Sequence, residues 1–500
     1  MPSQNIYDRV IYPAATHPDT HPRRLAAIAR LHGIPAVAPD NCRVLEIACN
    51  TGANLIPMAY ALPGSQFTGF DLAGGAIAEG QRRIESLGLR NIRLLQADLM
   101  EADQLPELQG EFDYIIAHGL YSWVPDAVRD RLLGFCNERL SPHGIAFISY
   151  AALPGGYLRL LSREILLAVE GHGTENVPEK GLDVLRFIAA SRPEGDGFRV
   201  LLEREIHGME RRGPAVVFHD EMASEYKPVS FQDFFLHAQA HTLQHFSDAQ
   251  IPPPTDPCYR AEVRKKIQEL VGDDSLANEQ ALDFVRMRSY RESLLCHAGV
   301  PFQVDPQLEP MRHLWLSSKA SVERRSDGVC VFSLPDLVRF EAQDPGLIAL
   351  LGGLADRFPE AVPFAEITGP IVAQGLASET QLLTLLLQLV IARFITLEAS
   401  PVPVPVPVPV AHGVPDRPKL SPLCLVFLNG GGLIVTPLHA TLSTEEPLVF
   451  KLLQLLDGTR DHADLARELA ARSPEIPPGD IEGGLNGMLQ LFYRAGALEA

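Results

Sequence analysis

The chain has 500 residues, which is too many for one hydrophobic core, so we expect about two to four domains. Its 62 acidic and 43 basic residues give a formal net charge of −19. Because a field of this sign repels phosphate, the composition argues against general nucleic-acid binding. The seven cysteines are scattered and none forms a C-x-x-C pair, so we expect reduced thiols and no metal site.

The first residues contain no apolar stretch of the kind that a secretory signal carries. The longest apolar stretch, residues 382–397, is interrupted by Gln388 and Arg393. It is too short to cross a bilayer, and we interpret it as a buried helix. We therefore expect a cytoplasmic protein that does not insert into membranes.

Residues 5–24 are rich in aromatic, histidine and proline residues and show no regular period. We expect them to form an ordered arm, which either covers a cofactor as a lid or packs on the flank of a sheet. Apolar residues at helical spacing then predict a helix over residues 23–32.

Strand-like and helix-like segments alternate in the next part of the chain. We expect strands at residues 44–47, 67–71, 92–96, 112–117 and 145–150, and helices at 54–61, 75–87 and 126–140. Such alternation predicts right-handed crossovers and a mainly parallel sheet.

A turn of small residues, Ala48 to Gly52, follows the first strand and precedes a helix. A strand, a tight turn and a helix form the nucleotide-binding corner of an open α/β sheet, because backbone N–H groups and a helix N-terminus are exposed there. Two acids, Asp71 and Asp98, end the second and third strands. A carboxylate at the first position can accept from both hydroxyls of a ribose, and one at the second can accept from the exocyclic amine of adenine.

These segments resemble the ordered motifs of class I S-adenosylmethionine-dependent methyltransferases. The matching motifs are Val-Leu-Glu-Ile-Ala-Cys-Asn-Thr-Gly at 44–52, Gly-Phe-Asp-Leu at 69–72, Gln-Ala-Asp-Leu at 96–99 and Phe-Asp-Tyr-Ile-Ile-Ala-His-Gly at 112–119. The resemblance implies a Rossmann-like sheet of seven strands whose last strand is antiparallel, with S-adenosyl-L-methionine as the cofactor.

The resemblance also implies a set of cofactor-binding residues. They are Glu46, Ala48, Asn50, Gly52, Asn54, Asp71, Leu72, Asp98, Leu99 and His118, joined by Tyr12 and His21 of the arm. The family's turn usually carries glycines where Ala48 and Asn50 stand here. Asn50 tolerates a left-handed backbone better than most residues, so a cofactor can still be bound.

Further motifs are similar to those of a multidomain group with a methyltransferase regulatory domain, which includes bacterial outer-membrane-protein lysine methyltransferases. These motifs lie at residues 12–22, 118–125, 149–155, 286–297 and 455–461. We expect an α/β methyltransferase domain at 1–155, a helical regulatory domain at 156–305, a winged-helix-like module at 306–400, a stiff Pro-Val linker at 401–415 and a second winged-helix-like module at 416–500.

Three histidines, His237, His241 and His245, recur at intervals of four residues on a helix expected within 228–245. No acid or cysteine joins them at ligand spacing, so we interpret them as histidines at the surface or core edge rather than as a metal site. A second helix is expected at 281–297. Both C-terminal modules are acidic, which favours recognition of protein over DNA.

The loop after the fourth strand supplies His118, Tyr121 and Trp123. By the resemblance, Tyr121 and Trp123 line the acceptor channel and His118 orients the cofactor or assists proton removal; the alternative is that they pack under the next helix. Three functions remain open: a methyltransferase acting on nitrogen of protein lysine, one acting on oxygen or nitrogen of a small molecule or peptide, and a non-catalytic scaffold.

Overall fold

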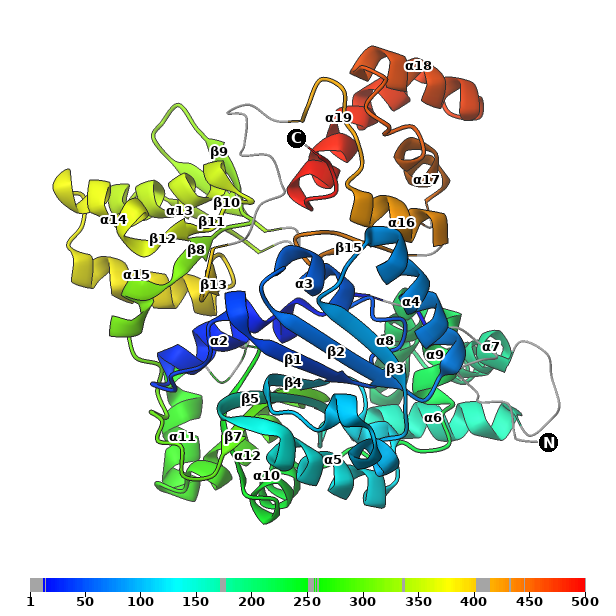
Figure 1. Ribbon diagram of the computed structural model, residues 1–500, viewed down its shortest axis with the longest axis vertical. Coiled ribbons are helices and arrows are strands. Elements are labelled where there is room, and N and C mark those ends of the chain that lie inside the picture. The colour runs from blue at the N-terminus through cyan, green and yellow to red at the C-terminus, as the bar shows by residue number, and fades with distance from the viewer. Residues whose placement is uncertain are drawn as a thin grey trace.

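The computed structural model describes residues 12–499 except 14, 171–176, 251–255, 257, 259, 335–337, 402–413, 431–432 and 445 (Figure 1). The first part of the expected arm, residues 5–11, and most of the expected Pro-Val linker lie outside the described residues, so those expectations stay predictions.

One sheet of seven strands, in the order β3-β2-β1-β4-β5-β7-β6, forms the centre of the protein (Figure 1). Its strands are β1 (Arg43–Ile47), β2 (Gln66–Asp71), β3 (Ile92–Gln96), β4 (Phe112–Ala117), β5 (Leu140–Ala151), β6 (Leu243–Asp248) and β7 (Tyr290–His297). The first five strands are parallel, whereas β7 lies antiparallel between β5 and β6. The predicted Rossmann-like sheet with an antiparallel last strand is confirmed.

Helices cover both faces of this sheet. One face packs against α2 (Pro22–Leu31), α3 (Leu55–Ala61) and α4 (Gly74–Leu87). The other face packs against α5 (Asp126–Arg139) and α10 (Phe231–Ala240). Alternate residues of one strand point to opposite faces, so Val44 joins the first core and Leu45 the second.

The prediction of a helix over residues 281–297 is wrong for the second half of that range. Helix α12 (Ser275–Arg286) is capped by Met287, whose backbone is left-handed with φ 50°, and β7 follows. Since β7 is paired on both sides and buried almost throughout, its apolar run carries no strand-like alternation. Strands β6 and β7 therefore extend the sheet beyond residue 155, where the first domain was expected to end.

Between β5 and β6 the chain is mainly helical. Besides α10, these helices are α6 (Gly156–Glu170), α7 (Val177–Ala190), α8 (Gly197–Arg212) and α9 (Pro214–Glu221), and α11 (Ala261–Val271) lies between β6 and α12. A small separate core joins α6, α7, α8 and α9, with Leu166, Leu185 and Met209 fully buried.

Two further units follow β7. The first contains η7 (Glu309–His313), β8 (Trp315–Ser317), β9 (Ser321–Arg324), β10 (Cys330–Ser333), β11 (Arg339–Ala342), α13 (Pro345–Arg357), β12 (Val362–Pro363), α14 (Phe364–Ala373), α15 (Glu379–Ile391) and β13 (Thr396–Glu398). The second contains α16 (Pro422–Gly430), β14 (Ile434–Val435), β15 (Thr441–Leu442), α17 (Pro447–Leu453), α18 (His462–Arg472) and α19 (Pro478–Arg494). Their winged-helix character stays a prediction.

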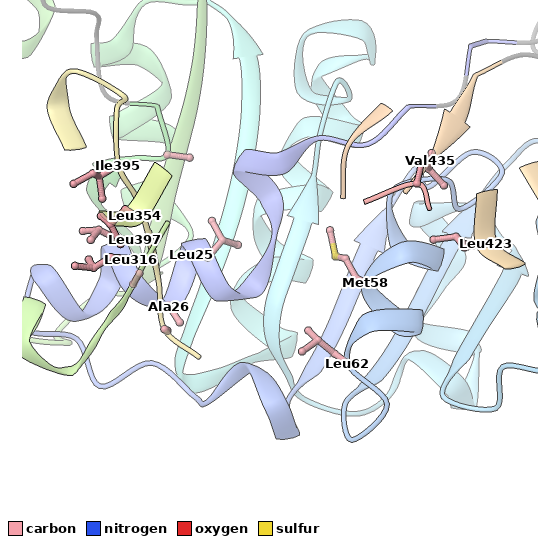
Figure 2. Close-up of a cluster of buried hydrophobic side chains, with 14 of the residues drawn as sticks. Leu25, Ala26, Met58, Leu62, Leu316, Leu354, Ile395, Leu397, Leu423 and Val435 are labelled. Atoms are coloured by element: carbon pink, nitrogen blue, oxygen red, sulfur yellow. The ribbon is translucent and has the colours of Figure 1, made fainter. Parts of the chain in front are cut away.

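Both units pack against the first core of the sheet. Figure 2 shows Leu25 and Ala26 of α2 near the first unit, and Met58 of α3 near Leu423 and Val435 of the second. Across the described residues, no helix combines the length and apolar character needed to cross a membrane.

Candidate functional site

The turn between β1 and α3, residues 48–54, is here called the β1 turn. Ala48, Asn50 and Gly52 have φ angles of 59°, 50° and 70°, so left-handed residues alternate along it. A side chain in that conformation costs about 1–2 kcal/mol, and such strain is concentrated at ligand sites. Asn50 adopts a left-handed backbone, which its residue type tolerates better than most, and Ala48 does so as well.

The β1 turn packs tightly against its neighbours. A Cβ atom on Gly52 would lie 2.8 Å from Leu94 Cδ1, and one on Gly69 of β2 would lie 2.8 Å from Cys49 Sγ. The turn is therefore held close to β2 and β3, with its backbone at the carboxyl ends of the strands.

Glu46 lies beneath the β1 turn and is 4% exposed. Its Oε1 accepts a hydrogen bond from Asn54 Nδ2 at 2.8 Å, whereas its Oε2 is buried with no hydrogen-bond partner among the described residues. Burial raises the pKa of Glu46 to about 8, against the opposing effect of Asn54. An unpartnered carboxylate oxygen at this depth fits a cationic or hydrogen-donating group of a ligand.

Asp71 ends β2 and faces the β1 turn. Its carboxylate accepts from the Asn50 and Ala73 backbone N–H groups, each at 2.9 Å. Burial raises the pKa of Asp71, and these backbone donors oppose the rise. Each carboxylate oxygen retains a free lone pair for a ligand hydroxyl.

Asp98 follows β3 and begins the 3₁₀ helix η3 (Leu99–Gln104), where it accepts from Met100 N at 2.9 Å. Leu99 is buried, but Leu72 and Met100, directly after Asp71 and Leu99, are exposed by 56% and 49%. Because β2 and β3 are adjacent and parallel, these apolar side chains and Asp98 lie at the same edge of the sheet. The exposed apolar side chains can pack on the flat face of a nucleobase, while Asp98 can accept a hydrogen bond from a polar group at its edge.

The described part of the arm lies over the β1 turn. His17 N donates to Asn54 Oδ1 at 2.8 Å, and Asn50 Nδ2 donates to the Tyr12 carbonyl at 3.3 Å. His21 is instead buried against His439 of the second C-terminal unit, with ring centroids 5.2 Å apart. The arm residues that bond the β1 turn are thus Tyr12, which was expected, and His17 and Thr20, which were not among the expected cofactor-binding residues.

His118 follows β4 and is stacked by His17, with ring centroids 3.6 Å apart. Burial, followed by the neighbouring His17, holds the pKa of His118 well below its usual value, so the ring is neutral near pH 7. Its Nε2 lies 3.8 Å from Oε1 of Glu292 on β7. Burial also raises the pKa of Glu292 to about 8, and its Oε2 has no partner among the described residues.

Two more side chains complete this cluster. Ser149 of β5 accepts from the Tyr290 hydroxyl at 2.7 Å and from Gly119 N at 2.8 Å. The sequence motifs at 149–155 and 286–297 contain Ser149, Tyr290 and Glu292, but nothing in their spacing assigns them to a site.

Trp123 and Tyr12 meet at α9. Trp123 Nε1 donates to the Asp220 carbonyl at 3.2 Å, and the Tyr12 hydroxyl bonds the Asp220 side chain. Arg159 lies over the Trp123 ring at 5.5 Å. Tyr12 of the arm and Trp123 of the loop after β4 therefore both contact Asp220 of α9.

Tyr121 begins η5 (Tyr121–Trp123), and its side chain lies in the second core rather than beside Trp123 and Tyr12. It is 2% exposed and packs against Tyr150 and Phe234 in the second core. Its hydroxyl bonds His237 Nδ1 at 2.8 Å. This position matches the packing alternative for Tyr121 and does not place it beside His118.

Comparisons with known proteins agree with this geometry. A methyltransferase domain model matches residues 44–144, and a model described as a predicted methyltransferase regulatory domain matches residues 213–297. Two uncharacterized proteins of Rickettsia prowazekii, RP789 and RP028, are 33% and 38% identical over 59% and 32% of this chain. The chain spans only 53% and 63% of their lengths.

PKMT2 from Rickettsia typhi has a similar structure, with a TM-score of 0.80 at 22% identity over 97% of this chain and 99% of that protein. The same protein in complex with AdoHcy matches with a TM-score of 0.79 at 21% identity, again over 97% and 99% of the two chains. The regulatory model covers β6 and β7, which belong to the central sheet. Residues 44–144 and 213–297 therefore match a methyltransferase domain and a methyltransferase regulatory domain, and the two matched segments share one seven-stranded sheet on a fold similar to that of PKMT2.

Proposed function

We propose that this chain is an S-adenosylmethionine-dependent methyltransferase that acts on nitrogen of protein lysine side chains. The observation that carries the proposal is the β1 turn, where three left-handed residues lie over a buried Glu46 with an unpartnered oxygen. This arrangement is found within the segment that matches a methyltransferase domain.

The residues around the β1 turn fit each part of the cofactor. Glu46 Oε2 is suited to the ammonium group, Asp71 to the ribose hydroxyls and Asp98 to the exocyclic amine of adenine. Leu72 and Met100 offer apolar surface to the base. When bound, S-adenosylmethionine supplies a methyl group activated by a sulfonium.

The cluster around His118 is suited to the acceptor. A lysine Nζ must lose its proton before it can act as a nucleophile. In its carboxylate form the buried Glu292 attracts an ammonium, and its raised pKa of about 8 makes that carboxylate a stronger base for the Nζ proton than an ordinary glutamate. His118 and the stacked His17 exclude water beside it, and Ser149 orients the Tyr290 hydroxyl.

Trp123 and Tyr12, which meet at Asp220, are suited to guide the aliphatic part of a lysine side chain toward this cluster. A protein acceptor is also supported by the resemblance of the motifs to bacterial protein-lysine methyltransferases. The described cysteines are all free and buried, which agrees with a proposed cytoplasmic location.

The proposal is tested in two steps on the purified full chain. Calorimetric titration with AdoHcy should show binding that is weakened in Glu46→Gln; no binding to the wild type would favour the scaffold alternative. Incubation of a bacterial lysate with methyl-labelled cofactor should then label protein at lysine, and Glu292→Gln should abolish the label while retaining AdoHcy binding. Label confined to small products would replace the protein acceptor with a small-molecule acceptor.

A further inference from the structure

Three side chains with metal-binding atoms meet on the surface away from the β1 turn. They are Asp130 of α5 and His237 and His241 of α10, and their nearest ligand atoms all lie within 4.8 Å of one another. The Nε2 atoms of His237 and His241 lie 3.4 Å and 2.8 Å from Asp130 Oδ1. The proposed methyl transfer uses none of the three.

The sequence interpretation of these histidines is only partly right. His237 lies in α10 and His241 caps its end, but His245 belongs to β6 and forms no stripe with them. An acid does join the pair, and it comes from 107 residues earlier in the chain. Spacing within the helix could not reveal Asp130, because α5 and α10 meet only in the folded protein.

The distances suit a small divalent ion. Zinc binds histidine nitrogen and carboxylate oxygen at about 2.0–2.2 Å, so neighbouring ligand atoms in a tetrahedral site lie roughly 3.4 Å apart. The separation of His237 Nε2 from Asp130 Oδ1, 3.4 Å, equals that value, whereas His241 Nε2, at 2.8 Å, lies at hydrogen-bond distance and has to move outward when an ion binds. Two histidines four residues apart lie on one side of a helix and can hold one ion together.

The surroundings orient the ligands. Nδ1 of His237 lies 2.8 Å from the buried Tyr121 hydroxyl, which leaves Nε2 facing Asp130. A hydrogen bond to the second ring nitrogen fixes the orientation of a metal-binding histidine. The side chains of His237, His241 and Asp130 are 26%, 20% and 68% exposed, so an ion can enter from solvent.

We propose that Asp130, His237 and His241 bind a divalent transition-metal ion, with zinc as the best fit and one coordination position open to water. Asp130 lies in the segment that matches the methyltransferase domain, and the two histidines lie in the segment that matches the regulatory domain. A bound ion therefore joins the two matched segments and, through Tyr121, supports the loop after β4.

Tag-free full-length protein, stripped with chelator, is titrated with zinc chloride by calorimetry and with cobalt(II) by visible absorption. We expect one equivalent to bind, with the strong cobalt absorption of a four-coordinate site, and a rise in Tm on adding zinc. Asp130→Asn and His241→Gln should each weaken zinc binding at least tenfold and remove the rise in Tm. Tyr121→Phe should weaken it about tenfold, as expected for a group that orients a ligand.

His207→Gln, at an exposed histidine of α8, is the matched control and should bind zinc as the wild type does. Absence of stoichiometric binding to the wild type overturns the proposal and leaves a hydrogen-bonded histidine–aspartate cluster. Equal zinc affinity in the wild type and Asp130→Asn also overturns it, since the ion is then bound elsewhere. If Asp130→Asn fails to fold, as judged by circular dichroism, Asp130→Ser replaces it in the same measurements.

Discussion

His17 and His118 are stacked face to face, with ring centroids 3.6 Å apart and planes inclined by 21°. The two residues are 101 positions apart, one in the arm and the other directly after β4. The His17 backbone also bonds Asn54, so His17 connects the arm to the β1 turn and to the cluster around His118. The described part of the arm therefore lies over the β1 turn and His118, and its role as a lid over a cofactor stays a prediction.

Replacing His17 by alanine should raise the pKa of His118 toward its usual value. Burial and the neighbouring His17 ring both lower the pKa of His118, and the substitution weakens both effects. Titration of the His118 ring followed by NMR measures the shift. Turnover should fall more than AdoHcy affinity, because the His17 backbone bond to Asn54 survives. An unchanged pKa of His118 would show that the stacking does not control its protonation, and His207→Ala is the control.

Substituting Gly52 by alanine should destabilise the protein more than substituting Gly88. Both residues are left-handed, with φ 70° and 64°, so each variant costs about 1–2 kcal/mol of backbone strain. Only at Gly52 would the new Cβ meet a neighbour, Leu94 Cδ1 at 2.8 Å, which adds about 1–3 kcal/mol. Urea unfolding of both variants tests this difference. Equal losses would mean that Leu94 moves aside at little cost, and Gly52→Ala should also lose AdoHcy binding.

Glu46→Gln should gain stability relative to the wild type as the pH rises from about 4.5 to about 8. Burial raises the pKa of Glu46 from 4.5 to about 8, so in this range the folded protein holds a proton that the unfolded chain releases. Wild-type stability then falls by about 1.4 kcal/mol per pH unit from this group, and glutamine removes that slope. Above pH 8 both states are ionised and the difference becomes constant.

Unfolding curves of the wild type and Glu46→Gln at pH 5, 6, 7 and 8 measure that difference. Glu107→Gln, at an exposed glutamate of η4 (Pro106–Leu108), serves as the control and should follow the wild type. Parallel stability profiles for the wild type and Glu46→Gln would show that Glu46 is ionised in the folded protein throughout this range.

His439→Ala should weaken AdoHcy binding from outside the methyltransferase domain. His439 is 3% exposed, and its Nε2 donates to the Asn54 carbonyl of the β1 turn at 3.0 Å. Losing this bond costs about 0.5–1.5 kcal/mol, which corresponds to an affinity loss of up to about tenfold. His462→Ala removes a comparable bond to the Pro415 carbonyl within the same unit and should leave affinity unchanged. Equal affinities of the two variants would contradict a role for the second C-terminal unit at the site.

The alternating part of the sheet and one edge of the site could be predicted from the sequence. Strands β1 to β5 carry apolar runs bounded by turn residues; Asp71 ends β2, and Asp98 lies two positions after β3. Parallel strands end at one edge of a sheet, so local patterns were enough to bring these acids near the β1 turn. The residue type of Asn50 is compatible with its left-handed conformation, whereas that of Ala48 gives no sign of it.

Only the tertiary structure decided the remaining features. The spacing of apolar residues in β7 does not distinguish a strand from a helix. The segment is a strand because it pairs with β5 on one side and β6 on the other. Glu292 meets His118 across 174 positions of chain, and Asp130 meets His237 across 107. Contacts between distant segments leave no fixed spacing in the sequence, because the length of the intervening chain does not affect which side chains finally touch. The sequence therefore determined the alternating strands β1 to β5 and the edge of the sheet where Asp71 and Asp98 lie, whereas folding determined that β7 is a strand and which distant side chains meet.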